Sequence, residues 1–240
     1  MKIALLNRNG YRISQLSAMS PQQLEHKLGS LRGEEEQQLC MVDALLFSMY
    51  EIDVQRFDEV LDAGFSQWTP LQMISQVIYP FLNKTGLLLQ GSRESYEHIA
   101  VTSIRKKLIW AIENTKVTPG GSEVMLFLPC TRQLDLGLLY MYYHLRQQSV
   151  KVCYLGNDVS LSNLEFVFGK CRPRLVYTYL HPKNDFNVDV LGSILKRILP
   201  QSRLVFTMQH PKAFRNLHQN LFHFQFDEAL SFLLQQCAAE

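Results

Sequence analysis

The sequence predicts an α/β protein in which a four-helix bundle precedes a five-stranded, doubly wound parallel sheet. Three observations support this. Between residues 34 and 116 apolar side chains recur every three or four positions, as on helices that bury one face. Between residues 123 and 240 short apolar runs alternate with amphipathic segments, as in chains of strand–helix–strand units. The segment VTPGGSE, residues 117–123, separates the two regions as a linker.

Composition limits the classes of protein that the chain can represent. It has 240 residues, of which 47% are apolar and 19% charged, so it can bury a large core. A net charge of +2 is too small to indicate nucleic-acid or membrane-surface binding by charge alone. No signal peptide and no apolar stretch of membrane-spanning length are present, and the five cysteines form no C-x-x-C pair. We therefore expect a cytoplasmic protein with reduced thiols and no membrane partner.

The first 33 residues are expected to contribute little to a core. Residues 1–19 predict two short helices joined by a turn at Asn9-Gly10, too small to fold alone, and so indicate a piece of a longer protein. Residues 20–33 are polar and interrupted by glycine, which predicts a linker with a weak helix.

Helix-start signals divide the bundle into four helices. Asp53 is a preferred N-cap residue, Thr69 is an N-cap followed by Pro70 at the first helical position, and Ser92 can cap the last helix. The four predicted helices are 34–50, 53–66, 69–90 and 93–115. With short connections they predict a bundle over residues 34–116.

The second region predicts five strands and five helices. The strands are 124–129, 151–155, 174–180, 203–208 and 221–225, and the helices are 132–148, 160–170, 187–199, 211–219 and 226–237. Ligands of open parallel sheets bind at the carboxyl ends of the strands. The loop 129–133 and the loop after Gly156 are therefore where a small molecule is expected.

Catalytic motifs are absent from the sequence. There is no nucleophile elbow, no P-loop and no zinc-protease motif, and His181, His210 and His223 lack metal-ligand spacing. Gly156-Asn157-Asp158 indicates a turn. Cys130 precedes a predicted helix, where a thiolate is stabilised, but a buried structural cysteine explains it more simply. We expect neither an enzyme nor a metal site.

Four stretches carry a resemblance to a known family: IYPFLNKTG (78–86), YEHIA (96–100), IRKKL (104–108) and VCYLGNDV (152–159). In these stretches, and in the order of its parts, the chain resembles the cobalamin-binding sensory half of MerR-family transcriptional regulators. Residues 1–19 look like the last helices of the winged-helix DNA-binding domain in that family. The resemblance implies that residues 123–240 form a Rossmann-like, cobalamin-binding-type domain.

The resemblance also implies a ligand site above and below a corrin ring. Glu97-His98 match the family's Glu-His pair, which faces the upper side of the ring, but no tryptophan lies about ten residues upstream. The family's lower motif is Asp-x-His-x-x-Gly, in which the histidine coordinates cobalt. Aligning its glycine on Gly137 places Arg132 at the acid and Leu134 at the histidine.

Two further positions complete the implied site. Thr178-Tyr179-Leu180 loosely match a Ser-x-Leu motif after the third strand, and Gln209-His210 replace a Gly-Gly pair against which the cofactor's nucleotide tail would lie. The resemblance thus implies ligand-binding roles for Glu97, His98, Leu134, Gly137 and Thr178. The residues themselves leave alternatives open: Glu97 can be a first-turn acid that the helix dipole favours, and His98 can be a core histidine on an apolar stripe.

The sequence therefore predicts the sensory and oligomerisation region of a MerR-like regulator whose cobalamin binding is lost or altered. We expect no bound cofactor, a homo-oligomer, and contact with DNA only through an N-terminal domain that these 240 residues lack. Two alternatives stay open. The chain can be the cobalamin carrier module of a methyltransferase-type enzyme, or a regulator that still binds cobalamin without a protein histidine ligand.

Overall fold

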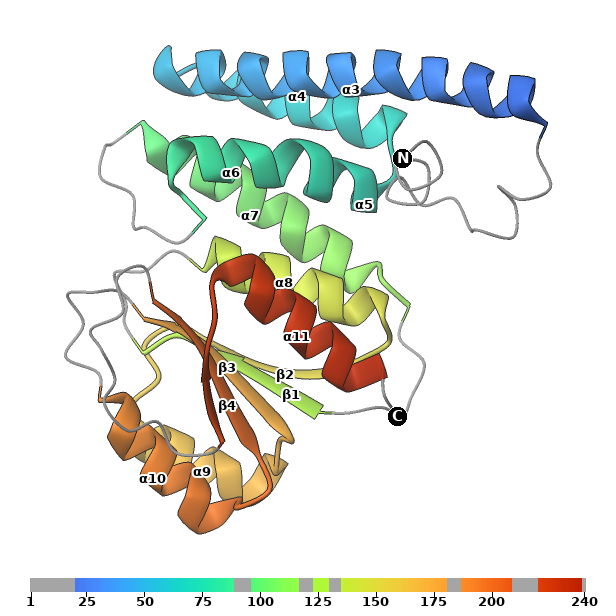
Figure 1. Cartoon of the computed structure of the whole chain (residues 1–240). Helices are drawn as coiled ribbons and strands as arrows, with labels where there is room; N and C mark the ends of the chain where they lie inside the picture. Colours follow the sequence, from blue (N-terminus) through green and yellow to red (C-terminus); the bar gives the residue numbers. More distant parts are fainter. Residues whose placement is uncertain are drawn as a thin grey trace. The chain divides into compact units, whose positions relative to one another are not determined.

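A computed structural model describes residues 20–88, 96–116, 123–129, 135–180, 187–208 and 220–238. The chain divides into two compact units, Met1–Thr85 and Gly86–Glu240, which we call the helical unit and the α/β unit. Figure 1 labels their helices and strands. The predicted helices of residues 1–19, most of the linker 117–123 and the predicted helix 211–219 lie outside the described residues.

Within its described residues, the helical unit has five helical segments, most of which begin at a capping residue. They are α3 (Pro21–Tyr50), α4 (Val54–Gln67), α5 (Pro70–Met73), a π-helical turn η1 (Ile74–Ile78) and α6 (Tyr79–Thr85). The carboxylate of Asp53 accepts a hydrogen bond from the backbone N–H of Arg56, and the hydroxyl of Thr69 accepts one from that of Gln72. These are two of the start signals that the sequence predicts.

Helix α3 begins earlier than the sequence predicts, because residues 21–33 are helical and continuous with residues 34–50. Its start has a local cause. Ser20 and Gln23 form a capping box, in which each side chain accepts a hydrogen bond from the other's backbone N–H, and Pro21 occupies the first turn. The glycines that suggest a linker are therefore tolerated inside a helix.

The predicted helix 69–90 is not uniform either. Residues 74–78 form one π-helical turn between two α-helical segments, and the last of these ends at Thr85. The core of the helical unit includes the rings of Phe57 on α4 and Phe81 on α6, which meet edge to face with centroids 5.6 Å apart.

The α/β unit contains a five-stranded, all-parallel sheet. Its strands are β1 (Glu123–Phe127), β2 (Lys151–Gly156), β3 (Leu175–Leu180), β4 (Arg203–Met208) and β5 (Leu221–His223), in the spatial order β2-β1-β3-β4-β5. The fold class predicted from the alternating pattern is thus confirmed. Because the chain moves from β1 to β2 on one side and then returns to β3 on the other, the strand order reverses at β1.

Helices cover both faces of the sheet. Helices α8 (Leu136–Gln147) and α11 (Phe226–Ala238) lie on one face, and α9 (Leu161–Cys171) and α10 (Val188–Ile198) lie on the other (Figure 1). Helix α7 (Glu97–Glu113) packs against α8 within the same unit. The sequence assigns this helix to the end of a four-helix bundle, but its contacts group it with the sheet. The four-helix bundle therefore stays a prediction.

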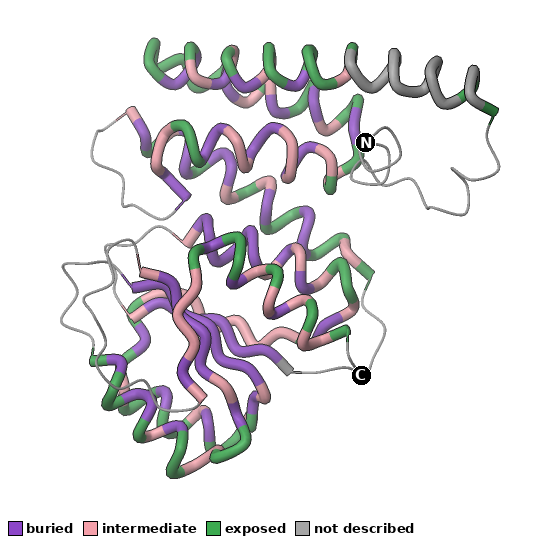
Figure 2. The backbone as a smooth tube through the Cα atoms, viewed as in Figure 1, coloured by how far each residue is buried: buried purple, intermediate pink, exposed green. Residues whose placement is uncertain are grey.

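The core of the α/β unit on the α9–α10 face is apolar and closely packed. Its members come from strands β1, β3, β4 and β5 and from both helices, and include Phe127, Phe168, Leu191 and Phe206, each fully buried. Figure 2 shows the central strands buried along their length, whereas α9 and α10 expose their outer sides. Among the described residues, no helix is long and apolar enough to cross a membrane.

Candidate functional site

The candidate site is the carboxyl edge of the sheet around β1, where the strand order reverses. The loop after β2 is attached to the end of β1 by two backbone hydrogen bonds. The N–H of Leu128 donates to the carbonyl of Gly156 over 2.8 Å, and the N–H of Val159 donates to the carbonyl of Leu128 over 3.0 Å. Gly156 and Asp158 have φ angles of 75° and 60°, so the loop turns sharply, as the sequence predicts for Gly156-Asn157-Asp158.

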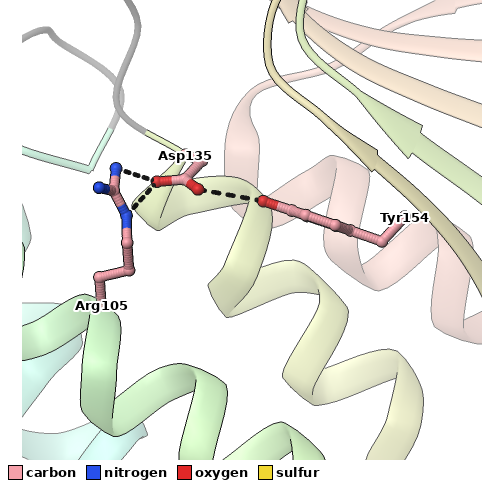
Figure 3. A network of polar contacts seen from close by, with 3 residues as sticks. All are labelled: Arg105, Asp135 and Tyr154. Atoms are coloured by element: carbon pink, nitrogen blue, oxygen red, sulfur yellow. Dashed lines mark hydrogen bonds and ion pairs between the residues drawn. The ribbon is translucent and has the colours of Figure 1, made fainter.

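A polar network of three residues lies beside this edge (Figure 3). One carboxylate oxygen of Asp135, at the start of α8, accepts hydrogen bonds from Nε and Nη2 of Arg105 on α7 over 2.8 and 2.5 Å. Its other oxygen accepts a hydrogen bond from the Tyr154 hydroxyl on β2 over 3.2 Å. The network thus joins a helix, the loop after β1 and an edge strand around one partly buried carboxylate.

The network explains the electrostatics of Tyr154. Burial, followed by the negative charge of Asp135, raises the pKa of the Tyr154 hydroxyl well above its usual value. The phenol therefore stays protonated and remains a hydrogen-bond donor to Asp135. Its ring also stacks on Tyr142 of α8, with centroids 5.4 Å apart. Tyr154 is thus held by Asp135 at its hydroxyl and by Tyr142 at its ring.

Aromatic side chains fill the space between α8, α11 and the sheet. The ring of Tyr140 on α8 lies 5.9 Å from Phe226 of α11 and 4.4 Å from His144 on its own helix. On the sheet below, the hydroxyl of buried Tyr177 donates to Oγ1 of Thr207 over 3.1 Å. A ligand tail that entered this face from the carboxyl edge would meet packed rings.

Burial also shifts the pKa of His144. Desolvation lowers it from 6.5 to about 4, and Nε2 of this residue has no hydrogen-bond partner within the described part of the chain. His144 is therefore neutral at physiological pH. Sequence patterns did not single it out, because it lies inside an amphipathic run of α8.

Four of the five predicted ligand residues are described. Glu97 and His98 form the first turn of α7, where Glu97 is buried and His98 is exposed. The alternative of a core histidine at His98 is therefore wrong, because that side chain faces away from the apolar stripe. Gly137 is buried in the first turn of α8. Thr178 is fully buried in β3, and among the described residues its hydroxyl has no hydrogen-bond partner.

The remaining positions implied by the resemblance lie outside the described residues. These are Arg132 and Leu134 after β1, Gln209 and His210 after β4, and also Cys130. The structure places Glu97 and His98 on α7, Gly137 on α8 and Thr178 on β3. Among the contacts described above, none links the α7 pair to Gly137 or Thr178. From residue 97 to residue 105 a helix rises about 12 Å, so the Glu97–His98 turn lies well along α7 from the Asp135 network.

The position that the resemblance assigns to the cobalt-ligating histidine holds Leu134, which has no lone pair for cobalt. The carboxylate of Asp135, the next residue, accepts hydrogen bonds from Arg105 and Tyr154. In the described part of the chain, no group of three or more histidine, cysteine, aspartate or glutamate side chains could hold a metal ion.

Sequence reasoning missed the network because its members are far apart along the chain. Asp135 is 30 residues from Arg105 and 19 from Tyr154, and no local periodicity reports such pairs. Two weak signals were present. Arg105 belongs to the IRKKL stretch, and Asp135 directly precedes the apolar run of α8, where an acid is favoured by the helix dipole.

Comparison with known proteins supports the resemblance. No family model matches the chain. The chain is 28% identical over 99 residues to the HTH-type transcriptional repressor CarA of Myxococcus xanthus, a match that covers 41% of this chain and 33% of the repressor. The chain thus spans about a third of the length of the curated relative that it matches.

Solved structures show the fold. The monomethylamine corrinoid protein of Methanosarcina barkeri superposes with a TM-score of 0.60 and 12% identity, covering 82% of this chain and 98% of that protein. The methanol:cobalamin methyltransferase complex MtaBC of the same organism matches with a TM-score of 0.45 and 13% identity, covering 98% of this chain and 93% of that one. This match is too distant to support an argument. The predicted resemblance is confirmed: part of the chain is similar to an HTH-type transcriptional repressor, and the chain has the helical-plus-Rossmann-like fold of a corrinoid protein.

Proposed function

We propose that this chain is the sensory and oligomerisation region of a MerR-like transcriptional regulator in which cobalamin binding has been lost or altered. The similarity to a transcriptional repressor supports the regulatory part. The fold shared with a corrinoid protein supports the ancestry of the ligand site. DNA would be contacted through a domain outside these 240 residues.

The observation that carries the proposal concerns Leu134 and Asp135, which follow β1 in the sequence. A leucine stands where the resemblance places the cobalt-ligating histidine, and the carboxylate of Asp135 that follows it is used to join α7 and β2. Three hydrogen bonds to its two oxygens hold this carboxylate between α7 and β2. Asp135 therefore has a structural role in this chain.

A lower cobalt bond is one of two ways in which the cofactor could bind. The other keeps the cofactor's own base attached and needs room for the nucleotide tail. Gln209-His210 replace the Gly-Gly pair at that position, and the rings of Tyr140 and Phe226 fill the α8–α11 side of the sheet. Contacts with the upper face alone would not offset the ordering cost of so large a ligand.

The unpartnered hydroxyl of Thr178 fits an altered site better than an empty one. It is fully buried at the carboxyl half of β3, where the resemblance places a ligand-contacting serine. A buried hydroxyl without a partner is costly unless a ligand or water satisfies it. A smaller and more apolar molecule with one hydrogen-bonding group would match this position.

The test is to mix the purified chain with hydroxocobalamin and adenosylcobalamin, desalt it, and record the visible spectrum. We expect no stoichiometric corrin absorbance. The double variant Arg132→Asp, Leu134→His then restores the family motif. Regained binding would show that only the ligand was lost, and continued failure would show that the pocket itself is filled. A one-to-one corrin spectrum with the unchanged chain would overturn the proposal.

The same experiment addresses the alternative of a methyltransferase carrier module. Such a module must hold a corrinoid in order to work, so it requires the unchanged chain to retain the cofactor after desalting. The shared fold alone favours neither activity, because one fold hosts unrelated functions.

A further inference from the structure

Two cysteine thiols meet between the edge strand and α9. Sγ of Cys153 on β2 lies 4.0 Å from Sγ of Cys171, the last residue of α9. Both are reduced and partly buried, and both side chains pack against the core on the α9–α10 face. They are 18 residues apart, so no C-x-x-C pattern reveals them.

The backbone on both sides permits the thiols to approach further. A disulfide needs its sulfurs about 2.05 Å apart, so the two sulfur atoms, 4.0 Å apart here, must approach by about 2 Å. Cys153 lies on β2, which is the edge strand of the sheet and pairs with β1 alone among the described strands. Cys171 ends its helix, since Arg172 has a left-handed φ of 45°, and a helix end moves more easily than a helix centre.

We propose that Cys153 and Cys171 form a reversible intramolecular disulfide, which makes the α/β unit a peroxide-responsive element. One thiolate attacks hydrogen peroxide, so that the O–O bond breaks, an S–O bond forms and hydroxide leaves, giving a sulfenic acid. The second thiolate attacks that sulfur, an S–S bond forms, and the S–O bond breaks to release hydroxide, which takes up a proton. Sulfur is oxidised by two electrons in total, and peroxide is reduced to water.

The cross-link would act on the carboxyl edge of the sheet. The loop between the two cysteines includes Gly156 and Val159, both hydrogen-bonded to Leu128 at the end of β1. Closing this loop covalently restricts the unfolded chain and fixes the C-terminal end of α9 to β2. Oxidation would thus stiffen the segment that borders the candidate site, whether or not that site binds a corrinoid.

Peptide mapping of the unchanged chain tests the proposal directly. The chain is treated with hydrogen peroxide, its remaining thiols are alkylated, and it is digested with trypsin under non-reducing conditions. Cleavage after Lys151, Lys170 and Arg174 isolates Cys153 in residues 152–170 and Cys171 in residues 171–174, because the bond before Pro173 resists trypsin. We expect the two peptides as one species, lighter than their sum by two hydrogen atoms, which dithiothreitol separates again.

Thermal unfolding gives a second measurement. The cross-link should raise the midpoint of unfolding by about 5–10 °C, as expected for a loop of this size in a chain of this length. The variant Cys171→Ser should lose this rise. The matched control Cys40→Ser removes an exposed thiol elsewhere and should keep both the cross-link and the rise.

The proposal is overturned if peptides 152–170 and 171–174 are recovered separately under conditions that oxidise exposed Cys40. Each peptide would then carry the alkylating label or be joined to a different cysteine. Since this readout uses the unchanged chain, it stands even if Cys171→Ser fails to fold.

Discussion

Replacing Arg105 by methionine tests whether the three-residue network stabilises the α/β unit. Methionine keeps most of the unbranched apolar stem and removes the guanidinium group. Asp135 then retains one donor, the Tyr154 hydroxyl at 3.2 Å, and loses the two that contact its other oxygen. The variant therefore leaves a partly buried carboxylate without its counter-charge.

The size of the effect follows from exposure. The side chain of Asp135 is 16% exposed and that of Arg105 is 37% exposed. Hydrogen bonds to charged groups contribute about 1.5–3 kcal/mol, whereas exposed ion pairs contribute about 0–1 kcal/mol. Because water screens the arginine, we expect Arg105→Met to lower the free energy of unfolding by about 1–2 kcal/mol.

Urea unfolding, followed by circular dichroism and tryptophan fluorescence, measures this change. A matched control is Lys84→Met, because Lys84 and Asp43 form an ion pair of 3.2 Å with side chains 45% and 64% exposed. The control should change the free energy by less than about 0.5 kcal/mol. If Arg105→Met is as neutral as Lys84→Met, the network is a surface contact and the structural role assigned to Asp135 is refuted.

Four further outcomes are expected. The pKa of His144 is about 4 in the folded chain and 6.5 in the unfolded chain, so the unfolded chain binds the additional proton as the pH falls. The contribution of neutral His144 to the free energy of unfolding is therefore present above pH 6.5 and decreases below it. Urea unfolding should show that His144→Gln reduces the decrease in this free energy between pH 7 and pH 5 by about 2 kcal/mol. Tyr177→Phe leaves the buried Thr207 hydroxyl without its donor at 3.1 Å and should cost about 1–2 kcal/mol by the same method, an effect that the added Thr207→Val should reduce. With a net charge of +2, the 240-residue chain should give no sequence-specific mobility shift with its promoter at moderate salt, and a specific shift would contradict the regulatory scheme. Light scattering should show a dimer or larger species, and a strict monomer at every concentration would place oligomerisation outside this region.

The α/β region could be predicted closely because its signals are local. The predicted strand 203–208 coincides with β4, and the predicted helices 160–170 and 187–199 differ from α9 and α10 by one residue at each end. Strands buried on both faces read as continuous apolar runs, and the helices between them keep one apolar stripe.

Other features depended on interactions that periodicity does not encode. The extension of α3 to Pro21 was signalled by the Ser20–Gln23 capping box but was outweighed by nearby glycines. The π-helical turn at residues 74–78 leaves the apolar spacing nearly unchanged. The Arg105–Asp135–Tyr154 network and the Cys153–Cys171 pair arise only when distant segments meet, so the sequence could not reveal them.

The resemblance contributed positions that periodicity cannot supply. At the position that it implies for the cobalt-ligating histidine the sequence has Leu134, which is why we expect cobalamin binding to be lost or altered. It did not reveal that Asp135, one residue after Leu134, is engaged by another helix and another strand. The hydrogen bonds of Asp135 to Arg105 and Tyr154 therefore support the proposal that the site is altered, in addition to the leucine at the ligand position.

Cobalt content per chain is the most direct measurement of the central claim. The purified 240-residue chain is saturated with hydroxocobalamin, passed through two desalting columns, and analysed for cobalt and protein by elemental and amino-acid analysis. We predict far less than one cobalt per chain, with Arg132→Asp, Leu134→His analysed beside it. One cobalt retained per unchanged chain would contradict the account, because a leucine at the ligand position and an engaged Asp135 would then be compatible with a working corrinoid site.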